Sequence, residues 1–184
     1  MILPNMQFLI VLSLLAASTV SAQSKAWEKV SATFNDFFNP GFNEWQKELD
    51  RLSVSNKPLS LSQLAAWIDI VGSGHIELAS ALEDPQPLPP KDIKGMCDNF
   101  PRLMDLTAEK SRATGAFGMI VTSIGQDKFL GNGQMRHALQ HFQGGFEKTV
   151  DRLNKHKIDC SGTLPPKIKA AEKELKEAIL KWQK

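Results

Sequence analysis

The two cysteines of this 184-residue chain, Cys97 and Cys160, constrain its fold more than any other feature. Apolar residues between them recur every three or four positions, which predicts two amphipathic helices. The pair lacks the C-x-x-C spacing of redox-active or metal-binding thiols, so we predict a structural disulfide at the base of a long helical hairpin. On the chain-entropy model, closing a loop of this length stabilises the folded state by about 4 kcal/mol.

The first 22 residues have the layout of a signal peptide. An apolar run over residues 8–17 leads to Val-Ser-Ala at 20–22, which is a small-x-small cleavage pattern. The run is shorter than the ~20 residues that span a bilayer, and no later segment approaches that length without charges. We expect a mature chain from Gln23 that folds as a single domain over residues 23–184. The protein would then be secreted and extracellular, with no integral membrane segment in the mature chain; an uncleaved anchor is the alternative.

Five amphipathic stretches follow the predicted leader. Their apolar stripes step by three and four, over residues 27–52, 61–82, 92–124, 135–153 and 165–182. No stretch alternates apolar and polar residues in the way that a half-buried strand does. The pattern predicts an all-α fold, an antiparallel bundle of about five helices with one disulfide.

Prolines and caps divide these stretches. Pro40 interrupts the first stripe without changing its phase, which predicts a kinked helix or two short coaxial helices. Ser60, with a glutamine three residues later, matches a capping box at the start of the second helix. Asn99 before Pro101 predicts a cap that restarts the third helix. Four prolines within residues 85–90 predict a stiff, extended linker.

Charge and motifs argue against several function classes. The formal net charge of +2 is small for a protein that binds a phosphate backbone, so no nucleic-acid partner is expected. His137 and His141 lie four residues apart on one helix face, but the glutamate of a zinc-protease motif and a third ligand are missing. His75 lies on an apolar stripe and fits a hydrogen-bonded core histidine. No serine-nucleophile motif occurs. We therefore expect no enzyme, no metal site and no other cofactor.

Six glycines fall near the middle of three predicted helices, at positions 72, 74, 115, 118, 144 and 145. Each costs on the order of 1 kcal/mol relative to alanine inside a helix, so some other interaction should compensate. One explanation is close backbone approach, or simply the ends of shorter helices. The other is a waist that bends around an apolar ligand, although aromatic residues at helical spacing are by default core. The ligand-binding residues would be Phe38, Phe42, Phe117, Phe142 and Phe146.

The order of parts resembles a known family. The segment LEDPQPLPPKDI leads into the third helix, and GTLPPKIKAAEKELKEAILKW closes the chain with a helix that bears alanine and lysine. With a leader and two earlier amphipathic helices, this order resembles the secreted fungal hydrophobic-surface-binding proteins and the related cell-wall galactomannoproteins, over nearly the whole mature chain. The resemblance implies a helical bundle that binds fatty acids or adsorbs to hydrophobic surfaces.

These observations predict a secreted, non-enzymatic helical bundle that binds apolar ligands, such as fatty-acid-like lipids, or hydrophobic surfaces. Burial of an acyl chain would contribute about 0.8 kcal/mol per methylene. The alternative is a secreted interaction protein, of effector or reproductive-fluid type, that binds a protein partner through its outer surface. A small secreted hydrolase is a third and more distant hypothesis.

Overall fold

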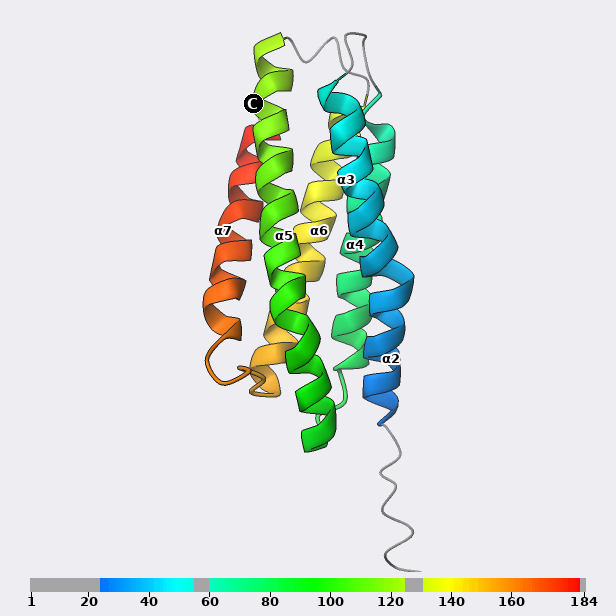
Figure 1. Cartoon of the computed structure of the whole chain (residues 1–184), viewed down its shortest axis with the longest axis vertical. Coiled ribbons are helices and arrows are strands. Elements are labelled where there is room, and N and C mark those ends of the chain that lie inside the picture. Colours follow the sequence, from blue (N-terminus) through cyan, green and yellow to red (C-terminus); the bar gives the residue numbers. More distant parts are fainter. Residues whose placement is uncertain (1–23, 55–59, 125–130, 183–184) are drawn as a thin grey trace, which may run out of the picture.

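The computed structural model describes residues 24–54, 60–124 and 131–182, and the predicted signal peptide lies outside them. Its regular elements are α2 (Lys25–Thr33), the π-helix η1 (Phe34–Phe38), α3 (Asn39–Ser53), α4 (Ser62–Ala81), α5 (Pro90–Ile124), α6 (Asn132–Lys155) and α7 (Leu164–Trp182). Because α2, η1 and α3 form one continuous run, five helical rods stand side by side (Figure 1). The predicted all-α antiparallel bundle of five helices with one disulfide is confirmed.

Consecutive rods run in opposite directions, but the most extensive contacts join rods that run parallel, α4 with α6 and α5 with α7 (Figure 1). Around the bundle the neighbours follow the order α3, α4, α6, α7 and α5. Since α4 and α5 make few direct contacts, the chain has to cross the base of the bundle between them. The non-helical segment 83–89 makes this crossing, as the proline-rich composition predicts.

Pro40 lies inside the first rod, where a π-turn accommodates it. Asn39 N–H donates to the carbonyl of Phe34, five residues back, which defines the wide turn of η1. Pro40 itself has no N–H and its ring crowds the preceding turn, so a locally wider helix relieves the strain. The rod therefore continues past the proline with its apolar phase intact, and Trp45 in the next turns is fully buried.

Two predicted helix caps are wrong. α5 is continuous through Pro101, and the Asn99 side chain donates to the carbonyl of Gly95 at 2.8 Å instead of capping a new helix. α4 begins at Ser62 and has no capping box, since its N-cap residue makes no side-chain hydrogen bond. Ser60 Oγ accepts from Ser62 N–H at 3.2 Å, so the serine closes a local turn. In both cases the side chain forms a hydrogen bond with a nearby backbone group instead of the predicted cap.

Cys97 and Cys160 form the predicted disulfide, with Cα atoms 5.2 Å apart. Cys97 lies near the start of α5, whereas Cys160 lies in the connection between α6 and α7. The bond therefore ties the base of α5 to the connection between α6 and α7, and it closes a loop that contains both α5 and α6. Cys160 and Ser161 have left-handed backbone conformations (φ 53° and 58°), which cost roughly 1–2 kcal/mol each, and Gly162 follows with φ 80°.

The apolar faces of all five rods meet in one core. Large side chains that are almost completely buried come from every rod: Phe38, Trp45, Leu64, Phe100, Phe142 and Trp182. Each predicted apolar stripe thus supplies the core, as amphipathic helices in a bundle do. Among the described residues, no helix is both long and apolar enough to cross a membrane.

Glycines let the parallel helix pairs approach closely. A Cβ added at Gly72 would lie 2.9 Å from Phe142 Cα, and one at Gly145 would lie 2.5 Å from the carbonyl oxygen of Gly72. α4 and α6 therefore touch through their backbones. A Cβ at Gly115 would lie 3.2 Å from Ala178 Cα, so α5 and α7 pack in the same way. Close backbone approach, the first explanation for the mid-helix glycines, is confirmed at these positions.

Candidate functional site

The five phenylalanines predicted to line a ligand site are all buried. Their exposed fractions are 2% for Phe38, 3% for Phe42, 5% for Phe117, 0% for Phe142 and 1% for Phe146. Four of them join through ring contacts with Trp45 and His75 in the middle of the bundle. Phe117 instead lies against Trp182, between α5 and α7, with ring centroids 6.4 Å apart. All five belong to the packed core, and their contact with a ligand stays a prediction.

His75 of α4 is fully buried at the centre of this cluster. Its ring centroid lies 4.9–5.5 Å from those of Phe38, Phe142 and Phe146. Its Nδ1 lies 3.1 Å from Oγ1 of Thr149 on α6, and that hydroxyl donates its single hydrogen to the His75 carbonyl at 2.9 Å. The hydroxyl therefore accepts at the ring, so Nδ1 carries the proton of the imidazole. Burial lowers the pKa of His75 to about 3, and the predicted hydrogen-bonded core histidine is confirmed.

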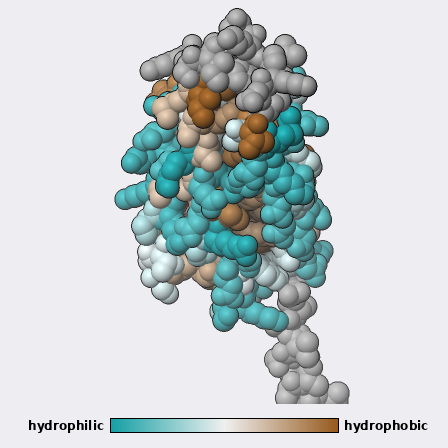
Figure 2. All heavy atoms as spheres, turned by 45° about the horizontal axis from the view of Figure 1, so that its top comes forward, coloured by the Kyte–Doolittle hydropathy of each residue, from teal (hydrophilic) through white to brown (hydrophobic). Residues whose placement is uncertain are grey.

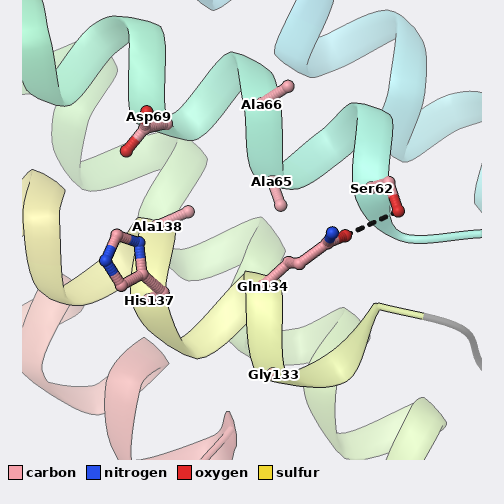
Figure 3. Close-up of a pocket in the computed structure, with 8 residues that line it drawn as sticks. All are labelled: Ser62, Ala65, Ala66, Asp69, Gly133, Gln134, His137 and Ala138. Carbon is pink, nitrogen blue, oxygen red and sulfur yellow. Dashed lines mark hydrogen bonds between the residues drawn. The ribbon is translucent and has the colours of Figure 1, made fainter.

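A groove of about 400 Å³ opens between the N-terminal halves of α4 and α6 (Figure 3). Small residues form its middle: Ala65 and Ala66 on α4 and Ala138 on α6. Gly133 lines it as well, and a Cβ added there would meet nothing within 4 Å. The groove exists because these side chains are too short to fill the space between two parallel helices. Its volume lies in the range of small-molecule sites.

Two polar contacts join α4 to α6 at the ends of this groove. Ser62 Oγ donates to Gln134 Oε1 at 2.6 Å, in the first turn of both helices (Figure 3). Seven residues further along each helix, Asp69 Oδ1 lies 2.7 Å from His141 Nδ1. This second contact has the distance of an ion pair but not the alignment of a hydrogen bond. Two helical turns span about 10 Å, so the contacts bracket a groove of about that length.

Two further polar side chains of the groove are those of His137 and Ser62. His137 lines the groove one turn before His141, with an exposed side chain. In the part of the chain that the structure describes, no three His, Cys, Asp or Glu side chains are placed to hold a metal ion. The Ser62 hydroxyl is bonded to an amide, which cannot act as the general base that a serine nucleophile needs.

A second feature is an apolar end of the bundle, formed by Val54, Met119, Ile120 and Leu180. Their side chains are 50–82% exposed, and they lie near the C-terminal ends of α3, α5 and α7, which point the same way (Figure 1). Figure 2 shows apolar side chains gathered near that end, while the visible sides of the bundle are mostly polar. Exposed apolar groups that cluster in this way mark interaction surfaces more often than isolated ones do.

The groove was not anticipated from the sequence. Ala65 and Ala138 lie beside large core residues on the buried faces of their helices, and periodicity does not distinguish a short side chain that packs from one that leaves space. The seven-residue spacing shared by Ser62 and Asp69 on α4 and by Gln134 and His141 on α6 was a usable signal. It becomes meaningful only once α4 and α6 are known to be parallel neighbours.

Comparisons of the chain with protein-family models, with curated proteins and with solved structures give no match.

Proposed function

We propose that this protein is a secreted, non-catalytic binding protein for small apolar ligands, and that the ligand lies in the groove between α4 and α6. The groove itself carries the proposal, because it combines a volume of about 400 Å³ with an alanine-lined middle and hydrogen-bonding groups at both ends. This combination is typical of small-molecule sites. The Cys97–Cys160 disulfide supports secretion, since such bonds persist in oxidising compartments.

The packing of the core supports a ligand at the surface of the bundle. Phe142 and Phe146 have almost no exposed surface and contact His75, and Gly145 beside Phe146 lies against the Gly72 carbonyl of the facing helix. A ligand at that level would have to displace close-packed side chains, which costs typically 1–3 kcal/mol per overpacked site. A ligand in the groove displaces none of them. The fatty-acid-like body expected from the sequence can lie over the alanines.

Adsorption to hydrophobic surfaces is the second candidate, and the exposed Met119, Ile120 and Leu180 favour it. An apolar surface would bury these side chains at about 25 cal/mol per Å². This proposal matches the resemblance to fungal hydrophobic-surface-binding proteins. A Met119→Ser/Leu180→Ser variant should adsorb less to a hexadecane–water interface, and an Ala66→Leu substitution should leave adsorption unchanged.

The groove proposal is tested with 1-hexanol as the apolar probe and with methyl NMR of alanine-labelled protein as the readout. Full burial of the six-carbon chain is worth at most about 5 kcal/mol, which sets a lower bound of roughly 0.2 mM on the Kd, and the cost of association raises the Kd above that bound. The methyl signals of Ala65, Ala66 and Ala138 should shift together. Signals of alanines outside the groove, such as Ala170, should stay in place.

The matched variants for this experiment are Ala66→Leu and Ala170→Leu. Both alanines are exposed on helices, so both variants should fold, but only Ala66 lines the groove. Leucine at position 66 should fill the groove and weaken hexanol binding by at least tenfold, whereas leucine at position 170 should not change it. Equal binding to the two variants, or shifts confined to other alanines, would contradict a ligand in this groove.

A further inference from the structure

The described lining of the groove has an acidic side chain but no Lys or Arg to balance it. Of the described residues that line it, Asp69 is the only acidic one and none is Lys or Arg. We propose that the groove selects organic amines, with the ammonium group beside Asp69 and the apolar body over the alanines. This inference rests on the proposed binding function and adds the charge of the ligand to it.

Asp69 can accept an ammonium group without losing its partner on α6. His141 Nδ1 lies near one carboxylate oxygen, Oδ1, and the Asp69 side chain is 48% exposed. A carboxylate has acceptor sites on both oxygens, so a second donor can approach from the groove. Charge-assisted hydrogen bonds of this kind are roughly twice as strong as neutral ones.

His137 adds a second acceptor at the same end of the groove. Figure 3 places Asp69 and His137 towards one end, on opposite helices, and the Ser62–Gln134 pair at the other. An ammonium group has three hydrogens to donate, and a neutral imidazole has one nitrogen that accepts. A ligand carboxylate at this end would instead face the negative charge of Asp69. The groove therefore favours an amine over a fatty acid of the same chain length.

The alanines limit the body of the ligand to a compact apolar group. Ala65, Ala66 and Ala138 present methyl groups without hydrogen-bonding capacity between the two polar ends. A second polar group placed over them would lose its hydrogen bonds to water. A primary amine with a short alkyl or ring-shaped body satisfies both the carboxylate and this apolar middle.

Three probes with the same six-carbon chain test the inference: hexylammonium, 1-hexanol and hexanoate. Their affinities are measured from the methyl shifts of Ala65, Ala66 and Ala138 in the complete folded chain. We expect hexylammonium to bind about tenfold more tightly than hexanol, and hexanoate to bind more weakly than both. Added salt should weaken hexylammonium binding and leave hexanol binding nearly unchanged, because only the ion pair is screened.

Asp69→Asn is the decisive variant, and Glu77→Gln, an exposed carboxylate on the same helix but outside the groove, is its control. The first should bring hexylammonium to the affinity of hexanol, and the second should change neither. If hexanol shifts the groove alanines but hexylammonium binds no more tightly, or if Asp69→Asn leaves amine binding intact, the charge inference is wrong while the groove proposal stands. If hexanol fails to shift these alanines, the groove proposal itself is wrong.

Discussion

His75 and Thr149 hold α4 and α6 together through two hydrogen bonds that share one hydroxyl. Thr149 Oγ1 donates to the His75 carbonyl at 2.9 Å and accepts from His75 Nδ1 at 3.1 Å. The ring is enclosed by aromatic side chains, and its Nε2 is buried without a hydrogen-bond partner among the described residues. A protonated imidazole would carry a second N–H there, with no acceptor in its surroundings. Protonation of His75 at low pH should therefore destabilise the centre of the bundle.

The first prediction concerns pH. The pKa of His75 is about 3 in the folded state and ordinarily 6.5, so folding favours the neutral ring. Stability from this group is complete above pH ~6.5 and is lost as the pH falls towards ~3, because the unfolded chain then binds the proton more readily. Between pH ~7.5 and ~5 the loss amounts to about 2 kcal/mol. Urea unfolding of the wild-type protein at the two pH values measures it.

The control for this prediction separates His75 from the other titrating groups. His75→Gln removes the titration and should unfold with a much smaller pH dependence over the same interval, even if its stability at neutral pH is lower. His137→Gln, at an exposed position, should retain the wild-type dependence. If His75→Gln shows the full acid destabilisation, the buried ring is not its source.

A second prediction uses the adjacent glycines Gly144 and Gly145 as an internal pair. A Cβ at 145 would lie 2.5 Å from the Gly72 carbonyl oxygen, whereas a Cβ at 144 would meet nothing within 4 Å. Gly145→Ala should therefore destabilise the bundle by about 1–3 kcal/mol through overpacking. Gly144→Ala should stabilise it by up to about 1 kcal/mol through helix propensity. The denaturant midpoints of both variants measure these changes in stability. Changes of the same sign would contradict the close approach of α4 and α6.

The disulfide supplies a third prediction. A Cys97→Ser/Cys160→Ser variant should lose about 4 kcal/mol of unfolding free energy, the entropy term for a loop closed across a sequence separation of 63. Relief of the left-handed backbone at Cys160 and Ser161 would reduce the loss. Since neither cysteine lines the groove, hexanol should bind the folded fraction of the variant as it binds the wild type. An unchanged denaturant midpoint would show that the bond does not constrain the fold.

The fourth prediction concerns the oxidation of exposed and buried methionines. Met119 is 52% exposed at the apolar end, whereas Met96, Met104 and Met135 have no exposed surface. Dilute hydrogen peroxide should convert Met119 to its sulfoxide well before the three buried methionines, because oxidation follows exposure. Peptide mass spectrometry reads the order directly. Equal oxidation of Met119 and Met104 would show that the core around α5 opens to solvent.

Much of the fold was predictable from local patterns. The steps of three and four placed Trp45, Phe142 and Trp182 in the core, and the cysteine pair gave the disulfide. The predictions were wrong where one side chain could form a hydrogen bond with either of two partners. Asn99 could have capped a new helix, but it bonds the Gly95 carbonyl and α5 continues.

The candidate site was not predictable to the same degree. The phenylalanines proposed as its lining are core residues, and the groove was unforeseen because it depends on which helices are neighbours. Ala65 and Ala138 face the same space only because α4 packs against α6 in parallel. That pairing is fixed by long-range contacts such as those between Gly72 and Phe142, and no local pattern encodes it.

The location of a bound ligand distinguishes a groove between α4 and α6 from a pocket in the aromatic core. Intermolecular NOEs from hexylammonium to the protein discriminate between the groove and the aromatic interior in one experiment. We predict cross-peaks from the probe methylenes to the methyl groups of Ala66 and Ala138. Cross-peaks to the ring protons of Phe117 or Phe146, with none to these alanines, would place the ligand in the core and contradict the groove.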